Sequence, residues 1–189
     1  VLRDAGLEPL LYTPADVPEL GNHPFYWPGR HYANRPNVAA VRRGSGGGRS
    51  LVLSGHIDTV PAGSAPWTRD PFGGEVDGNR LYGRGSNDMK AGIAANLFVA
   101  EALAALGIQL AGDLTFESVV DEEFGGVNGT LAGRLMGFNA DAAVISEPSL
   151  LRVLPAQRGG RTIDITFTAG NAGILGAGPA LSVIDQLRI

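Results

Sequence analysis

The sequence contains no cysteine, only three histidines and few charged residues. The lack of cysteine excludes disulfide frameworks, cysteine-ligated zinc sites and thiol catalysis. Its 15 basic residues stand against 19 acidic ones, for a formal net charge of −4, and they form no basic cluster. No apolar run reaches the roughly 18 residues that a membrane-spanning helix needs. We therefore expect a globular protein whose partners include neither nucleic acid nor a membrane.

The 189 residues suffice for one domain, or for one domain and part of a second. Glycine accounts for 28 residues, about twice its usual share, which indicates many tight turns and places where backbone approaches a ligand closely. The chain begins at Val1 and shows no secretory signal pattern. We expect it to be a piece of a longer, cytoplasmic protein.

Short apolar segments alternate with amphipathic ones along most of the chain. We expect a long ordered loop over 13–36, a hairpin over 74–83, a helix opening at Asp88 and a second helix over 129–136. The predicted strands cover 8–12, 37–42, 51–54, 113–120 and 142–145. This order predicts an α/β fold with a largely parallel sheet. From about 160 the pattern changes to one alternating strand (161–168) and a helix (179–187), so we place a domain boundary between 1–159 and 160–189.

Acidic and imidazole side chains follow four of the predicted elements. They are His56 with Asp58, then Asp88, the run 121–123, and Glu147. In open α/β sheets ligands bind at the carboxyl ends of the strands, so these segments are expected to converge. One imidazole with several carboxylates and no thiol suits zinc, cobalt or manganese.

Each of these residues also has an ordinary structural explanation. Asp88 is equally suited to cap its helix, 121–123 to form a solvated loop, and Glu147 to start a turn before Pro148. The convergence of all four segments favours a metal-dependent hydrolase.

Four motifs support this interpretation. They read SGHIDTVP at 54–61, LYGRGSNDMKAG at 81–92, DEEFGG at 121–126 and SEP at 146–148. Together they resemble the zinc aminoacylase/carboxypeptidase family, which includes acetylornithine deacetylase, succinyl-diaminopimelate desuccinylase and glutamate carboxypeptidase. The resemblance covers about 51–168. It implies a three-layer α/β/α sandwich with a mostly parallel sheet, followed by the start of an α+β lid and dimerisation domain.

The resemblance also implies the metal ligands. His56, Asp88 and Glu147 would hold one zinc ion. Asp88 would bridge to a second zinc ion, which Glu123 would also bind. The implied reaction is hydrolysis of an amide bond in an N-acyl amino acid or small peptide, with a homodimer formed through the lid.

Two further residues receive roles by the same resemblance. Glu122 would be the general base, and Asp58 would orient His56. The residues themselves agree with these roles: positions i and i+2 of an extended segment share a face, and a carboxylate fixes an imidazole tautomer. Adjacent glutamates diverge, so Glu123 can bind metal while Glu122 remains free to transfer protons.

Two departures from the family pattern open an alternative. The family's second metal takes a histidine from near the end of a much longer chain, whereas His23 and His31 precede the first motif and are interpreted as loop residues. The lid segment reads Gly-Asn-Ala-Gly at 170–173, and we assign Asn171 no role. A catalytically inactive metal-binding fragment or pseudo-enzyme is therefore the alternative, with a related aminopeptidase as the third choice.

Overall fold

The structure is a computed structural model that describes residues 1–156, 159 and 165–166. The chain divides into two compact units, Val1–Val153 and Leu154–Ile189. All elements described below belong to the first unit. The strand expected over 161–168 and the helix expected over 179–187 lie outside the described residues, apart from 165–166, so the lid and the boundary at 159/160 stay predictions.

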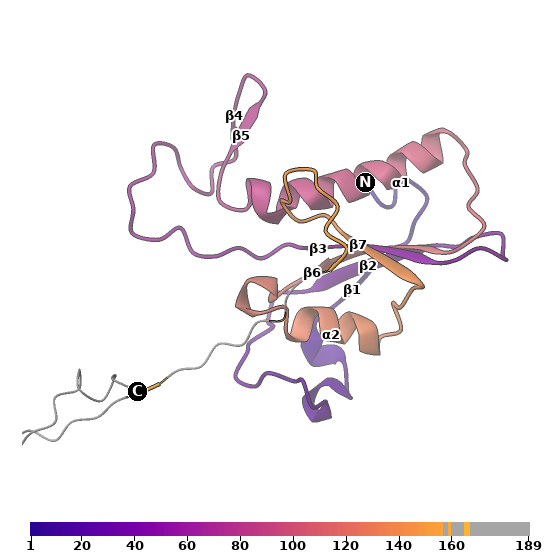
Figure 1. Ribbon diagram of the computed structural model, residues 1–189, viewed down its shortest axis with the longest axis horizontal. Helices are drawn as coiled ribbons and strands as arrows, with labels where there is room; N and C mark the ends of the chain where they lie inside the picture. The colour runs from indigo at the N-terminus through magenta and orange to yellow at the C-terminus, as the bar shows by residue number, and fades with distance from the viewer. Residues whose placement is uncertain (157–158, 160–164, 167–189) are drawn as a thin grey trace, which may run out of the picture. The chain divides into compact units, whose positions relative to one another are not determined.

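Five strands form a mixed sheet in the order β1-β2-β6-β3-β7 (Figure 1). β3 pairs in parallel with β6 and β7, whereas β2 pairs antiparallel with both β1 and β6. The expected α/β fold is confirmed. Within the described residues the sheet is mixed and not mostly parallel as expected, because the N-terminal strands β1 and β2 add antiparallel pairings to the parallel ones of β3. The strands are β1 (Leu10–Tyr12), β2 (Asn37–Arg42), β3 (Leu51–His56), β6 (Leu114–Val119) and β7 (Ala142–Ile145).

Helices cover both faces of this sheet, α1 (Ala91–Ala105) on one side and α2 (Asn128–Leu135) on the other (Figure 1). The alternation along β6 explains the layers, since successive side chains of a strand point to opposite faces. Phe116 belongs to the apolar cluster that includes Ala100 of α1. The next residue of β6, Glu117, accepts a hydrogen bond from Arg134 of α2. Ala132 of α2 belongs to a second apolar cluster with Tyr12.

The remaining elements are short. A separate hairpin of β4 (Glu75–Asp77) and β5 (Arg80–Tyr82) confirms the hairpin expected over 74–83. The expected loop over 13–36 contains two single helical turns. The short helical segments are Pro14–Asp16, Leu20–Asn22, Glu122–Phe124 and Ser86–Lys90, the last of which is interrupted by non-helical backbone at Asp88 and Met89.

Two glycines let α1 and α2 approach the backbone that leads into the candidate site. A Cβ on Gly92 of α1 would lie 2.1 Å from the carbonyl oxygen of Ser146, the residue before Glu147. A Cβ on Gly129 of α2 would lie 1.8 Å from the carbonyl oxygen of Val120. Both helices are thus packed directly against the strand ends that carry acidic residues.

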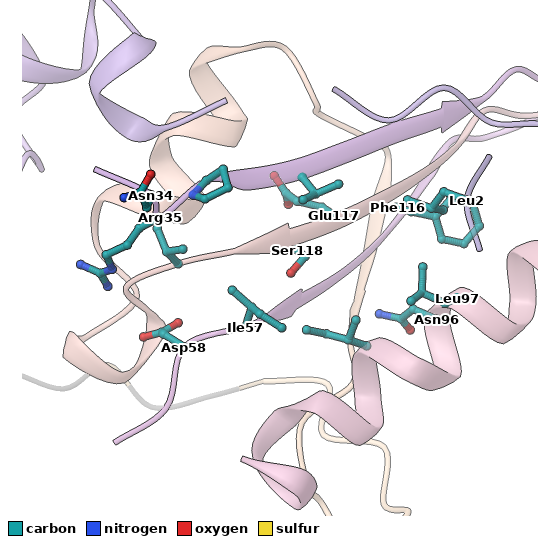
Figure 2. Close-up of a pocket in the computed structure, with 14 residues that line it drawn as sticks. Leu2, Asn34, Arg35, Ile57, Asp58, Asn96, Leu97, Phe116, Glu117 and Ser118 are labelled. Atoms are coloured by element: carbon teal, nitrogen blue, oxygen red, sulfur yellow. The ribbon is translucent and has the colours of Figure 1, made fainter. Parts of the chain in front are cut away.

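A cavity of about 560 Å³ lies between α1 and one face of the sheet (Figure 2). Its walls are mainly apolar, with Leu97 of α1 and Phe116 of β6 at one end and Arg35 and Asp58 at the other. Of the acidic and imidazole residues predicted for the site, Asp58 is the one that lines it. The cavity therefore adjoins the candidate centre and is distinct from it.

Candidate metal centre and active site

The predicted site residues meet where the parallel strands end. His56 is the last residue of β3, and Glu147 follows β7 by two residues. The turn that holds Glu122 follows β6, and Asp88 precedes α1. Because β6 and β7 both pair in parallel with β3, the carboxyl ends of these strands lie at the same edge of the sheet, as the sequence predicted.

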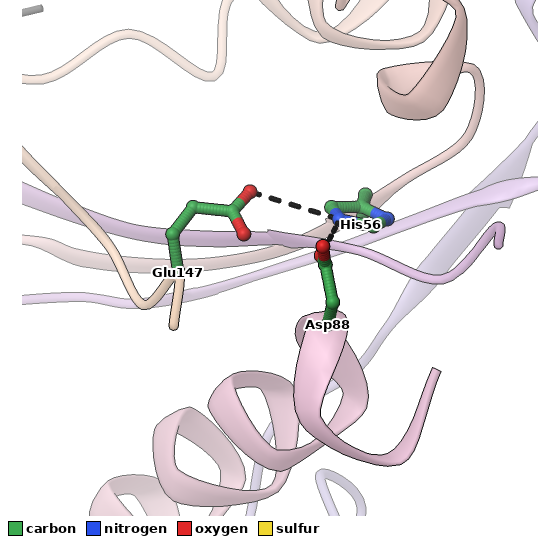
Figure 3. A group of neighbouring side chains, drawn as sticks. All are labelled: His56, Asp88 and Glu147. Atoms are coloured by element: carbon green, nitrogen blue, oxygen red, sulfur yellow. Dashed lines mark hydrogen bonds and ion pairs between the residues drawn. The ribbon is translucent and has the colours of Figure 1, made fainter. Parts of the chain in front are cut away.

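His56, Asp88 and Glu147 form one compact cluster (Figure 3). Their ligand atoms all lie within 4.8 Å of one another. Nε2 of His56 is 3.0 Å from Oδ1 of Asp88 and 3.6 Å from Oε1 of Glu147. Tetrahedral ligands held about 2.0–2.2 Å from zinc stand about 3.3–3.6 Å apart, so this donor set fits a metal ion with small adjustments.

The hydrogen bonding of the His56 imidazole is a second reason to expect a metal ion at this cluster. Nδ1 of His56 lies 2.9 Å from the backbone carbonyl oxygen of Asp58, which only accepts, so Nδ1 carries the proton and donates. In a neutral imidazole Nε2 then presents a lone pair to the oxygens of Asp88 and Glu147. Nitrogen and oxygen atoms whose lone pairs face one another in this way are stabilised by a shared cation.

The negative charge of the clustered carboxylates also favours a bound cation. Burial lowers the pKa of His56, but its contacts with the Asp58 carbonyl and with Asp88, together with nearby carboxylate charge, outweigh burial and raise it. Burial and neighbouring carboxylates raise the pKa of Glu147 against the opposing charge of His56. Within residues 1–156, no lysine or arginine forms an ion pair with Asp88, Glu122 or Glu147.

Asp58 holds both sides of the site together. Its carboxylate lies 3.6 Å from Nδ1 of His56, while its backbone carbonyl takes the imidazole hydrogen bond. Its two carboxylate oxygens accept the backbone N–H groups of Glu122 at 3.2 Å and Glu123 at 3.3 Å. Asp58, which was predicted to orient His56, therefore also supports the turn that carries the two glutamates.

The two glutamates have different surroundings. Oε2 of Glu122 lies 3.7 Å from Nε2 of His56, and its side chain is 43% exposed. Burial raises the pKa of Glu122, with a further contribution from Glu123, against the charge of His56. Oε1 of Glu123 accepts the backbone N–H of Val60 at 3.1 Å. Glu122 thus borders the three-residue cluster, and Glu123 points to the segment that follows Asp58.

Asp88 is positioned by backbone that differs from the prediction. Helix α1 begins at Ala91, and Asp88 itself is extended (φ −114°, ψ 101°) with no capping hydrogen bond from its side chain. The expected helix start at Asp88 is therefore wrong by three residues. Its carboxylate contacts His56 instead of the helix N-terminus.

Sequence reasoning missed a group of residues around Asp121. This carboxylate is fully buried and receives hydrogen bonds from Arg30, Tyr32 and Arg35 of the loop before β2. Burial would raise the pKa of Asp121, but these three donors outweigh burial and lower it. No local sequence pattern marks contacts between residues about 90 positions apart. The one visible sign was the abundance of proline, glycine, asparagine and aromatic residues in the loop over 13–36.

The two other histidines lie outside the cluster. Nδ1 of His23 accepts the backbone N–H of Phe25, and the two rings contact each other in a tilted arrangement with centroids 5.5 Å apart. His31 is exposed, and its carbonyl accepts from Arg35. Asn171 lies outside the described residues. In the described part of the chain, no helix has both the length and the apolar character needed to cross a membrane.

Curated relatives match the chain over about half to two thirds of its length. The N-formyl-4-amino-5-aminomethyl-2-methylpyrimidine deformylase of Halalkalibacterium halodurans is 46% identical over 121 residues, 62% of this chain and 28% of the relative. The succinyl-diaminopimelate desuccinylase of Methylocella silvestris is 48% identical over 47% of this chain and 23% of the relative. The acetylornithine deacetylase of Salmonella arizonae is 37% identical over 65% of this chain and 30% of the relative. The chain therefore spans less than a third of the length of these three relatives.

Solved structures share the fold. Human carnosine dipeptidase 1 matches with a TM-score of 0.54 at 22% identity, covering 76% of this chain and 30% of that protein. An M20 family metallo-carboxypeptidase from Sulfolobus solfataricus matches with a TM-score of 0.51 at 19% identity, covering 77% of this chain and 30% of that protein. The family model described as peptidase family M20/M25/M40 matches residues 52–175, which include all the predicted site residues. The chain therefore belongs to the M20/M25/M40 peptidase family.

Proposed function

We propose that this chain supplies the metal-binding part of an active site that hydrolyses an amide bond in N-acyl amino acids or small peptides. The observation that carries the proposal is the cluster of His56, Asp88 and Glu147 at the shared strand edge. Family membership supports hydrolysis. The names of the curated relatives describe removal of formyl, succinyl and acetyl groups. Removal of an acyl group is the chemistry that these names share.

The proposed metal is zinc, with two ions in a complete site; cobalt and manganese suit the same donors. His56, Asp88 and Glu147 would hold one ion, and Asp88 with Glu123 would contribute to the other. A divalent cation held there would supply Lewis-acid activation of water and of the amide carbonyl. The second position has two carboxylate ligands from this chain, so we expect it to bind zinc more weakly than the first.

Glu122 is the proposed general base. Its carboxylate borders the cluster without a lysine or arginine partner among residues 1–156, and it is exposed enough to meet substrate. It would take a proton from the attacking water and deliver it to the departing nitrogen. Asp58 would keep the Nδ1 side of His56 and the backbone of Glu122 in fixed relation, because it bonds to both.

Homodimerisation through the lid and a cytoplasmic location remain predictions. The inactive metal-binding fragment remains the alternative for the 189-residue chain by itself. That alternative is favoured by the single three-residue cluster within the described residues, which leaves the second metal position with two carboxylates. We expect the isolated chain to show little hydrolysis.

The test is an amide-hydrolysis assay on the zinc-loaded complete protein that carries this sequence. Substrates would be N-formyl, N-acetyl and N-succinyl amino acids and a set of dipeptides, with the released amine measured. We expect turnover of at least one substrate class, abolished in His56→Ala and retained in His23→Ala. Zinc binding without hydrolysis of any substrate would favour the inactive alternative.

A further inference from the structure

The turn that holds the two glutamates is contacted on both sides by one arginine. Nη2 of Arg30 donates to Oδ1 of Asp121 at 2.9 Å, and Asp121 directly precedes Glu122. The same guanidinium lies over the ring of Phe124, with Cζ 3.9 Å from the ring centroid, and Phe124 directly follows Glu123. Arg30 thus spans the backbone segment from which both glutamate side chains project.

This turn begins with an unfavourable backbone conformation. Asp121 lies in the left-handed region (φ 66°, ψ 21°), which few residues besides glycine, asparagine, aspartate and histidine occupy. Its buried carboxylate also accepts from the hydroxyl of Tyr32 at 2.7 Å and from Nη2 of Arg35 at 2.8 Å. Arg35 otherwise donates to the carbonyl of His31. Arg30 and Arg35 therefore bond to the same carboxylate oxygen, and it is Arg30 that also reaches the far side of the turn.

We propose that Arg30 is a positioning residue that sets the directions of the Glu122 and Glu123 carboxylates by bridging Asp121 and Phe124. A guanidinium suits this task because it bonds to a carboxylate in its plane and stacks on an aromatic ring with its face. The expected effect on turnover rests on the proposed function. The expected effect on the cobalt spectrum rests on Glu123 as a proposed metal ligand and is independent of whether the protein hydrolyses amides.

The first test compares two alanine variants in the zinc-loaded complete protein. Arg30→Ala is expected to lower kcat roughly 10- to 100-fold, the effect of a displacement of about 1 Å in a catalytic group. KM is expected to change little, because the lost interaction orients a proton-transfer group and contacts no substrate. Arg35→Ala, which removes a hydrogen bond to the same oxygen, is expected to cost much less kcat. Thermal unfolding of both variants shows whether their losses of stability are comparable.

The second test uses cobalt in place of zinc, because the visible absorption of bound cobalt reports the arrangement of its ligands. Addition of two equivalents of cobalt to Arg30→Ala is expected to give a spectrum altered from that of the wild type, since Glu123 has moved. Arg35→Ala is expected to keep the wild-type spectrum. Phe124→Leu provides a variant whose folding is not at risk, because Phe124 is 52% exposed. It removes the ring and is expected to shift kcat and spectrum in the direction of Arg30→Ala.

The outcomes separate the two proposals. Equal losses of kcat in Arg30→Ala and Arg35→Ala, or an unchanged cobalt spectrum in both Arg30→Ala and Phe124→Leu, would overturn the positioning role. A wild-type protein that binds cobalt but hydrolyses none of the amides would contradict the proposed function. In that case the cobalt spectra of the variants still decide whether Arg30 positions the glutamates.

Discussion

His56 is one imidazole among several carboxylates, and its surroundings define what each neighbouring residue can do. Its Nδ1 side is fixed by the carbonyl of Asp58, and its Nε2 side faces Asp88 and Glu147. Glu122 approaches the same nitrogen at 3.7 Å but remains 43% exposed. At the scale of single residues, the site therefore separates a cluster of three ligands, whose imidazole is buried and whose carboxylates are partly exposed, from Glu122 at its border.

This separation predicts a specific phenotype for Glu122→Gln. The amide keeps the size of the side chain but loses the ability to accept a proton, so turnover is expected to fall roughly 10²- to 10⁴-fold. Metal content is expected to remain that of the wild type, because the three clustered ligands are untouched. Metal analysis and steady-state kinetics on the same zinc-loaded preparation check both parts. Loss of zinc from Glu122→Gln, with zinc retained in Glu123→Gln, would show that the two glutamates have the opposite roles.

At the scale of elements, the packing of α2 against β6 carries the turn that holds Glu122. Gly129 lets the helix touch the carbonyl of Val120, one residue before Asp121. The contact is backbone to backbone, so neither side can move away by changing a rotamer. The position of the glutamate turn therefore depends on a residue with no polar side chain.

Gly129→Ala is expected to destabilise the protein by about 1–3 kcal/mol or more, because the added methyl group overpacks this contact. The higher helix propensity of alanine, about 1 kcal/mol, offsets only part of that loss. Gly21→Ala is the matched control, since its added Cβ would meet nothing within 4 Å and its φ is not in the left-handed region. Urea unfolding of both variants is the measurement. Equal stability of the two would show that α2 can shift away from β6.

The elements also show what the sequence can and cannot predict. β2 and β7 were predicted to the residue, because both are short apolar runs with clear boundaries. The start of α1 was misplaced because aspartate is a common helix cap, whereas here Asp88 bonds to a histidine 32 residues earlier. The buried face of α1 includes Asn96, which a purely apolar stripe does not anticipate; its side chain bonds to Ser54 and Ser146.

In the candidate site too, features set by local sequence were predictable and features set by distant contacts were not. The clustered ligands were predictable because each stands at the end of a strand or before a helix in a recognisable motif. The loop residues Arg30, Tyr32 and Arg35 were not, because their common partner Asp121 lies far away in the sequence. The antiparallel pairing of β2 with β6 likewise depends on contacts between distant segments.

At the scale of the whole molecule, one buried carboxyl links the layers. Glu117 of β6 is 1% exposed, accepts hydrogen bonds from Ser54 of β3 and Arg134 of α2, and lies near Tyr12 of β1. Burial raises its pKa, against the charge of Arg134 and the two hydrogen bonds. The folded state therefore binds the Glu117 proton more tightly than the unfolded state does.

This difference predicts how stability depends on pH. The stabilisation from the Glu117 proton is fully present below the unfolded pKa of about 4.3 and is lost as pH rises through the folded pKa. Relative to Glu117→Gln, the wild type is expected to lose free energy of unfolding as pH rises above about 4.3. Urea unfolding at several pH values measures this slope, with Glu101→Gln on the exposed face of α1 as the control. The same pH dependence in the wild type and Glu117→Gln would contradict the account.

The whole chain spans less than a third of the length of the three curated relatives compared above, yet it contains one complete set of three clustered ligands. Metal binding is accordingly the property that the chain is expected to retain by itself. The central claim is therefore that His56, Asp88 and Glu147 hold one metal ion.

Calorimetric titration of the 189-residue chain with zinc tests that claim most directly. We predict one tight site per chain, a second site that is weak, loss of the tight site in His56→Ala and its retention in His23→Ala. The absence of a tight site in the wild type, or an unchanged tight site in His56→Ala, would contradict the claim.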